Sequence, residues 1–190
     1  MPDVKPIAVH ASSLAVVVAL LLAIPTQALA DEWQVAPDLD DAVLSFGLTG
    51  GTVQLNDASM FSVPFNLTEW FALAPYGLAI RSPMAKVSAA GFGAVVRFQS
   101  PFGTRPYRIF LETYVGAIAG QSDETVDGVE VDTKLRYQGI SFAGAEFQVW
   151  RKLTWSLALG SAGAQDGLDA IHPRFGTANF AASTTFRWYI

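Results

Sequence analysis

The feature that most restricts the fold of this chain is an apolar alternation with a period of two residues, which recurs from about residue 42 to the C-terminus. In the last segment, for example, Phe186 and Trp188 share one parity and Arg187 lies between them. Because successive side chains of a strand point to opposite faces, this period predicts β-strands, whereas helical spacing of apolar residues is scarce. We predict eight strands, at about residues 42–55, 60–67, 69–80, 85–99, 107–119, 133–149, 153–160 and 174–190.

The first predicted strand contains a change of phase at Gly50-Gly51. Phe46 belongs to the apolar face before the glycines, and Val53 and Leu55 form that face after them. A slip of one residue at a glycine is typical of a β-bulge, so we predict a bulge here and a turn at Asn56-Asp57. The apolar face of the third strand is predicted to consist of Trp70, Ala72, Ala74, Tyr76, Leu78 and Ile80.

The connections between the predicted strands are of two kinds. Short reversals around Thr68, at 100–106 and at 151–152 alternate with connections on the other side, which include two long loops at 120–132 and 161–173. Short turns at one end and longer loops at the other are typical of β-barrels that span a bacterial outer membrane.

Charged residues of the clearest strands fall on the parity opposite the large apolar side chains. They are Arg97, Arg108, Glu112, Arg136, Glu146 and Arg187. In a closed barrel this parity faces the interior, where buried charges must pair with one another. We therefore predict a structural polar network in the lumen, and a narrow channel is the alternative. Arg108 and Glu112 need not touch directly, because they lie on one strand. A contact between Glu146 and Arg187 would have to cross the lumen.

The first thirty residues are organised like a secretory signal peptide. Lys5 and His10 precede the apolar run Leu14–Ile24, and Ala28-Leu29-Ala30 is a small-x-small cleavage site. The apolar run is too short to cross a bilayer as a helix, which takes about 20 residues. We predict cleavage after Ala30 and a single barrel domain over residues 31–190.

Composition favours a membrane barrel over a soluble one. The chain is 51% hydrophobic and 15% charged, whereas about 25% charged is usual in soluble domains. In a secreted lipocalin-like barrel, which is the alternative, one parity of this chain would expose Phe, Leu, Trp and Ile to water. A closed barrel satisfies all backbone polar groups in lipid. We therefore predict an all-β fold, a closed antiparallel eight-stranded transmembrane up-and-down β-barrel. Scattered basic residues and a net charge of −5 argue against a nucleic-acid partner.

With its signal peptide, its eight alternating segments and its terminal Phe-Arg-Trp-Tyr-Ile, the chain resembles the small outer-membrane β-barrel proteins of Gram-negative bacteria. The resemblance implies a location in the outer membrane, with its lipid and lipopolysaccharide as partners. It also implies that the barrel-assembly machinery recognises the terminal strand. Phe186 and Trp188 fit such an assembly signal, whereas Ile190 departs from the usual terminal aromatic residue. We expect a structural or surface-interaction role rather than catalysis.

His172 is the residue of the mature chain that invites a catalytic interpretation. Lipid A deacylases of the small-barrel class are similar in having a histidine before the last strand, but theirs is followed by a serine and then a glutamate. Here a proline and an arginine follow. His172 with Asp169 and Ser161 is the conceivable catalytic set, and lipid A modification is the runner-up function. The chain has no cysteine, and its mature part has one histidine, so we predict no cofactor and no metal. The loop at 120–132 is rich in acidic residues and is expected to be solvated.

Overall fold

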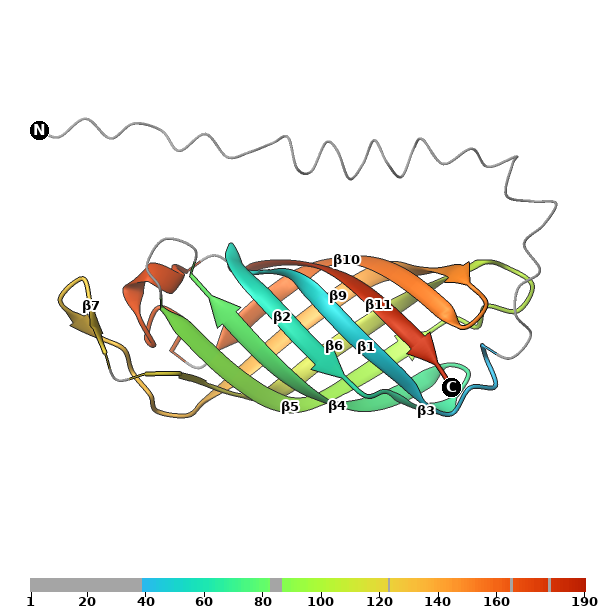
Figure 1. The fold of residues 1–190 in the computed structure, drawn as a ribbon, viewed down its shortest axis with the longest axis horizontal. Helices are drawn as coiled ribbons and strands as arrows, with labels where there is room; N and C mark the ends of the chain where they lie inside the picture. Colours follow the sequence, from blue (N-terminus) through green and yellow to red (C-terminus); the bar gives the residue numbers. More distant parts are fainter. Residues whose placement is uncertain (1–38, 83–86, 123, 165, 178) are drawn as a thin grey trace, which may run out of the picture. The chain divides into compact units, whose positions relative to one another are not determined.

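The computed structural model describes residues 39–82, 87–122, 124–164, 166–177 and 179–190 (Figure 1). The predicted signal peptide, residues 1–30, lies outside the described residues. In chain order the elements are β1 (Ser45–Val53), β2 (Asn56–Ser62), β3 (Phe65–Thr68), β4 (Phe71–Arg81), β5 (Ser88–Gln99), β6 (Tyr107–Gly120), β7 (Thr125–Val126), β8 (Val129–Glu130), β9 (Arg136–Trp150), β10 (Leu153–Ala164), the 3₁₀-helix η1 (Pro173–Phe175) and β11 (Phe180–Tyr189). No helix in the part of the chain that the structure describes has the length and apolar character needed to cross a membrane.

Eight strand positions close into one antiparallel barrel. β1 pairs with β11, so that Leu48 lies opposite Phe186 and the first and last strands are neighbours. β2 and β3 together occupy the second position, since β2 pairs with β1 and both pieces pair with β4. The other strands of the barrel pair with their neighbours in the chain. The closed, antiparallel eight-stranded architecture predicted from the alternation is confirmed.

The second strand position is divided at Val63-Pro64. Proline has no N–H group to contribute to a strand ladder, which explains why the pairing is interrupted there. The flanking backbone stays tied to both neighbours: Val63 N donates to Pro75 O at 3.2 Å, and Ser45 N donates to Pro64 O at 2.9 Å. The break therefore leaves the barrel closed.

The two ends of the barrel differ in their connections. We call the end with the short turns at 69–70, 100–106 and 151–152 the turn end; the C-terminus lies there (Figure 1). The opposite, loop end carries the β7–β8 hairpin and η1. The second long connection ends at Asn179, whereas we predicted that it ends at residue 173. Several of its apolar side chains, including Ile171 and Phe175, are buried, and the chain enters β11 only at Phe180.

The described strand β1 runs without a bulge through Gly50 and Gly51, so the predicted bulge was wrong. The two glycines lie opposite Thr184 and Ser183 of β11 in unbroken register, and the register with β2 is unbroken as well. Val53 is buried on the same parity as Thr49. The apolar phase changes because the lumen is polar beside Thr49 and apolar beside Val53.

The turn into β2 lies at Gln54-Leu55, not at the predicted Asn56-Asp57. Gln54 and Leu55 have φ values of 52° and 65°, and two consecutive positive φ values are typical of two-residue hairpin turns, whose twist matches the flanking strands. Leu55 is exposed at the tip of this turn and does not extend an apolar strand face. Asn56 begins β2, and its side-chain amide donates to Phe175 O at 2.9 Å.

Apart from Trp70, which lies exposed in the turn before β4, the apolar face predicted for the third strand points into the barrel. On β4, the buried residues are Ala72, Ala74, Tyr76, Leu78 and Ile80. The opposite face of β4 also carries small or apolar residues, such as Leu73 and Ala79. Alternation alone therefore separates the two faces of this strand without showing which one is inside.

The lumen is divided into an apolar half near the loop end and a polar half near the turn end. Strand β9 passes through both halves: Ile140 and Phe142 point into the first, and Glu146 and Gln148 point into the second. The apolar half includes Val53, Met60, Tyr76, Leu78, Ile80, Val95, Tyr114, Ile118, Ile140 and Phe142.

The outer face of the barrel exposes large apolar side chains on every strand position. They are Phe46, Leu48, Phe61, Phe65, Leu67, Leu73, Phe92, Phe98, Tyr107, Ile109, Leu111, Val115, Tyr137, Val149, Leu159, Phe186 and Trp188. The barrel is thus apolar outside along its strands and charged in one half of its interior.

Candidate functional site

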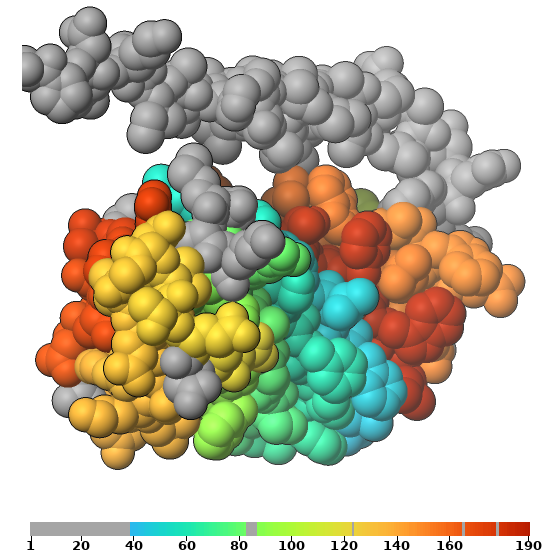
Figure 2. Space-filling model, turned by 60° about the vertical axis from the view of Figure 1, so that its left-hand side comes forward, coloured from blue at the N-terminus to red at the C-terminus, as the bar shows by residue number. Residues whose placement is uncertain are grey.

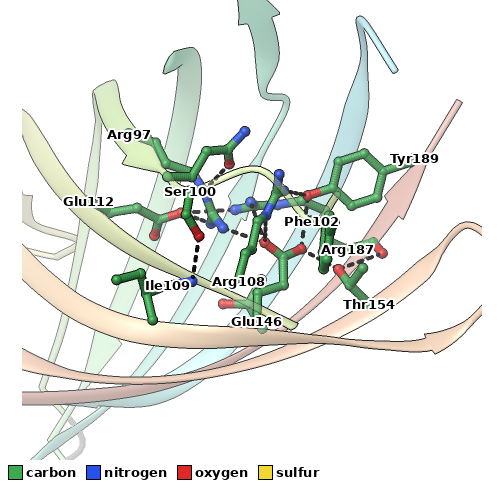
Figure 3. Close-up of polar contacts among 12 residues, drawn as sticks. Arg97, Ser100, Phe102, Arg108, Ile109, Glu112, Glu146, Thr154, Arg187 and Tyr189 are labelled. Carbon is green, nitrogen blue, oxygen red and sulfur yellow. Dashed lines mark hydrogen bonds and ion pairs between the residues drawn. The ribbon is translucent and has the colours of Figure 1, made fainter. Parts of the chain in front are cut away.

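The candidate site is a cluster of buried charges in the polar half, which we call the lumen network (Figure 3). Its members are Arg97 of β5, Arg108 and Glu112 of β6, Glu146 of β9 and Arg187 of β11. Each of these residues is at most 4% exposed. Strand parity directs them inward, since the residues next to them along each strand, such as Phe98 and Phe186, are exposed outside.

Glu146 lies at the centre of the network. One carboxylate oxygen accepts from Arg108 Nε at 2.9 Å and from the guanidinium of Arg97. The other oxygen accepts from the Tyr189 hydroxyl at 2.8 Å and from the Thr154 hydroxyl. A buried carboxylate is tolerated when its charge is paired and its lone pairs are satisfied, and Glu146 meets both conditions.

Glu112 forms the second centre. One oxygen accepts from Arg97 Nη1 and from Arg187 Nη2, the latter at 2.9 Å. Its other oxygen accepts from the Tyr114 hydroxyl at 2.9 Å. Arg187 Nη1 also lies 3.6 Å from Glu146. Arg97 and Arg187 therefore each link the two carboxylates into one continuous network.

These contacts cross the lumen. Arg187 and Glu112 belong to β11 and β6, which are not neighbours in the sheet, and Arg97 reaches Glu146 from β5 to β9. Arg108 and Glu112 are on one strand and contact different partners. A void beside Arg97, Glu112 and Arg187 measures about 10 Å³, which is room for about one water molecule. The network thus spans the lumen at this level.

Aromatic rings cover the arginines of the network. The Arg97 guanidinium lies 4.0 Å from the centroid of the Phe110 ring. The Arg108 guanidinium lies 4.4 Å from the centroid of the Phe102 ring and donates to the Tyr189 hydroxyl. Such stacking is favourable for a desolvated guanidinium.

The chain segment that precedes β1 packs against the turn end. Leu39 and Ala42 of this segment form a buried cluster with Phe102 and Tyr189. The Asp40 carboxylate accepts from the backbone N–H groups of Phe102 and Gly103 at 2.9 and 2.8 Å. The segment is therefore fastened across the end of the lumen network.

Side chains of the second long connection pack into the loop end. Leu168, Ile171 and Phe175 are buried and belong to the apolar core. Figure 2 looks toward this end, where the gold β7–β8 hairpin lies beside the orange-red segment before β11. Arg174 Nε donates to Asp127 Oδ2 at 2.9 Å and joins these two segments. Described segments of the chain thus pack at both ends of the lumen.

Arg136, which the alternation also assigned to the lumen, lies apart from the network. It is half-buried at the loop end, where its guanidinium donates to Asp132 at 2.6 Å and to Asp166 at 2.9 Å. Asp132 also accepts from the backbone N–H of Lys134 at 2.8 Å. This backbone hydrogen bond, followed by that from Arg136, lowers the pKa of the Asp132 carboxyl below its usual value.

His172 has a structural position at the start of η1. Its Nδ1 accepts from the backbone N–H of Arg174 at 3.2 Å, and its Nε2 lies 3.1 Å from Val126 O. With Nδ1 accepting, Nε2 carries the proton and donates to this carbonyl. Ser161, in contrast, is exposed in β10. Among the described residues, none of the hydrogen bonds of His172 is to Ser161.

The predicted assembly signal lies along and just after β11. Phe186 and Trp188 are exposed on the outer face, and Ile190 is exposed beyond the strand. The Trp188 ring packs edge-on against that of Trp150, with 6.4 Å between the ring centroids.

Partners of the network that sequence reasoning missed are uncharged. The charge pattern does not mark Tyr189 and Thr154, although Tyr189 shares the inward parity of Arg187 and Thr154 lies opposite Arg187 in the β10–β11 register. Tyr189 shares the parity of Arg187, so this spacing was a usable signal. Phe102 lies in a turn, where parity carries no information.

Potential metal ligands are dispersed: within the described ranges, no group of three His, Cys, Asp or Glu side chains is placed to hold a metal ion.

Comparisons with known proteins bear on the fold alone. No family model and no curated protein matches the sequence. Among solved structures, the chain is similar to the crystal structure of Neisserial surface protein A (NspA), with a TM-score of 0.51 and 10% sequence identity. The similarity covers 77% of this chain and 94% of that chain. The resemblance to small eight-stranded outer-membrane barrels is confirmed at the level of architecture.

Proposed function

We propose that this protein is an integral β-barrel of the bacterial outer membrane, with a closed, non-conducting lumen and a structural or surface-interaction role. The observation that carries the proposal is the apolar outer face of the strands, combined with a charge network inside. A soluble barrel has the opposite arrangement, with an apolar interior and a polar exterior. The similarity to a barrel described as a surface protein supports the same assignment.

The outer face fits lipid better than water. Phe92, Ile109 and Leu159 are each more than half exposed on the outside of the strands. Apolar patches of this extent are rare on soluble monomers, whereas a bilayer requires them. Tyr107 and Trp188 are exposed near the turn end, where an aromatic belt at the membrane interface would lie.

The lengths of the connections support an orientation. Outer-membrane barrels have short turns on the periplasmic side and longer loops outside the cell. The turn end would then face the periplasm, and the β7–β8 hairpin and η1 would face the cell exterior beside lipopolysaccharide. Phe186 and Trp188 of the last strand would be presented to the barrel-assembly machinery during insertion.

A closed lumen follows from how the interior is filled. An eight-stranded barrel is only wide enough for its own side chains. Here the lumen network crosses the polar half, and the segments with Leu39 and Ile171 cover the two ends. The network acts in this proposal as a structural plug that holds β5, β6, β9 and β11 together.

Membrane fractionation tests the location. We expect the native protein to stay in the outer-membrane fraction through high salt and carbonate, and to be released by detergent. Release by carbonate without detergent would contradict the proposal and favour a secreted lipocalin-like barrel.

Planar bilayer recording tests the closed lumen. The purified, folded barrel is expected to give no unitary current steps. Reproducible steps from the wild-type protein, abolished by a substitution such as Arg97→Ala, would show that the network lines a conducting path instead.

A further inference from the structure

We propose that a groove on the outer rim of the turn end binds the phosphate group and one acyl chain of a phospholipid. The groove lies between Trp70, in the turn before β4, and the β5–β6 turn, residues 100–106. This inference rests on the proposed membrane location, which would place the groove at the periplasmic leaflet.

The size and lining of the groove suit one lipid headgroup with the start of a chain. Its volume is about 450 Å³, within the range of roughly 300–1,000 Å³ that is usual for small-molecule sites. Trp70 lies on one side, Thr104 and Arg105 belong to the turn on the other side, and Tyr107 and Ile109 extend along β6.

Arg105 gives the groove one exposed cation that can bind a phosphate. Arg105 is exposed at the turn, and none of the ion pairs among the described residues involves it. A guanidinium can donate two parallel hydrogen bonds to phosphate oxygens, and the Thr104 hydroxyl can add a third. Two acids adjoin the lining residues and keep their negative charge. Glu69 accepts from the Trp70 indole, and Asp40 accepts from two backbone N–H groups of the turn, so Arg105 is the group of this rim that would bind the phosphate.

The apolar part of the groove continues into the outer face of the barrel. Ile109 is 64% exposed, and the next residue on its face, Leu111, lies opposite Phe98 of β5. An acyl chain that leaves the groove along Ile109 would therefore stay on apolar side chains. Trp70 and Tyr107 are amphipathic rings of the kind that lie at the headgroup level.

The wall of the groove is held in place before any ligand binds. Ser100 Oγ accepts from Ile109 N at 3.2 Å, and Ser100 N donates to Ile109 O at 2.9 Å. Phe102 is buried under the Arg108 guanidinium, so the turn is anchored to the lumen network. A preformed wall lowers the cost of ordering a ligand.

Native mass spectrometry of the detergent-solubilised, folded barrel, titrated with phosphatidylglycerol, tests the inference. We expect one lipid to bind with clearly higher affinity than any further lipid, and Arg105→Ala to weaken this binding by about 10-fold or more. Lys152→Ala removes the same charge from a neighbouring turn at the same end and is expected to leave the binding within about 2-fold of wild type. Trp70→Ala is expected to weaken binding although Arg105 is intact. Unchanged affinity in this variant would show that the lipid does not bind in the groove.

Equal weakening by Arg105→Ala and Lys152→Ala would show general charge attraction and overturn the site. Diacylglycerol that binds as tightly as phosphatidylglycerol would exclude a role for the phosphate. Inorganic phosphate that displaces the lipid at equal concentration would identify a free-anion site instead.

Flotation of the same variants with phosphatidylglycerol vesicles separates this inference from the proposed function. If the variants float with the vesicles and bind lipid like wild type, the groove inference alone fails. If wild type fails to float, the membrane location itself is wrong.

Discussion

The two halves of the lumen are filled in different ways, and the difference follows from the connections at each end. Near the loop end, a long connection reaches back and adds Leu168, Ile171 and Phe175 to an apolar core. Near the turn end, the turns between strands are short, and the strands fill the space with their own long side chains, such as Arg97 and Glu146. Long loops can supply apolar packing, whereas short turns leave the lumen to charged side chains that span it.

The two kinds of filling also differ energetically. An apolar core loses the transfer free energy and packing of the atoms that are removed, so the cost scales with the change in volume. A buried charge network loses about 3–5 kcal/mol when one member is removed, because the partners stay buried without compensation, whereas a small core truncation such as Ile→Val costs about 0.5–1.5 kcal/mol. The polar half is therefore expected to be the more sensitive half to single substitutions.

The largest effect is expected for Glu146→Ala. This change leaves Arg97 and Arg108 without a carboxylate that both contact, and it should lower the free energy of unfolding by about 3–5 kcal/mol. Urea unfolding of the barrel folded in phospholipid vesicles, followed by tryptophan fluorescence, measures it. Glu130→Ala in the exposed β7–β8 hairpin is the control and should change stability by no more than about 0.5 kcal/mol. Equal losses of unfolding free energy for both variants would show that the buried network contributes no more to stability than an exposed glutamate.

A smaller loss of stability is expected for a change in the segment that precedes β1 at the turn end. Asp40→Ala removes the acceptor of two backbone N–H groups and should cost about 1.5 kcal/mol, reduced toward 1 by solvent exposure. Asp41→Ala, at the exposed neighbouring position, is the matched control and should be neutral. The same urea unfolding measurement applies, and a cost for Asp41→Ala as large as that for Asp40→Ala would show that the carboxylate bonds to Phe102 and Gly103 are not the cause.

In the apolar half, Ile140→Val should cost about 0.5–1.5 kcal/mol, because one buried methylene is lost and no charge is left unpaired. Ile140 and Glu146 lie on the same face of β9, so the pair compares the two halves within one strand. A cost for Ile140→Val above that for Glu146→Ala would reverse the proposed ranking.

The smallest effect concerns Asp132 at the loop end. Its folded-state pKa is lowered by the backbone of Lys134 and by Arg136. Its contribution to stability is therefore present above the unfolded pKa, about 3.9 for aspartate, and is lost as the pH falls through the lowered folded value. NMR titration of the carboxyl carbon should give a pKa below that of a model peptide, and Arg136→Gln should raise it. A folded pKa at or above the peptide value would contradict the stabilisation of the Asp132 carboxylate by these hydrogen bonds.

Much of the fold could be predicted from the alternation alone, because a period of two residues is a local property of a strand. The strand positions, the antiparallel closure and the separation of Arg97, Arg108 and Glu146 from the outward apolar residues all depend on this period. The errors arose where local pattern is ambiguous. At Val53 and along β4, apolar residues point inward, and nothing in the alternation distinguishes an apolar lumen from an apolar exterior.

The sequence by itself determined that this chain forms strands with two distinct faces, with the charges of the clearest strands on one of them, since side-chain parity is set by the backbone. Only the tertiary structure decided which charges meet. Arg187 reaches Glu112 across the lumen, and Arg136 does not join them, because closure and register place residues far apart in sequence at one level of the barrel. Likewise, the groove beside Arg105 exists only because two separate turns meet at the same rim.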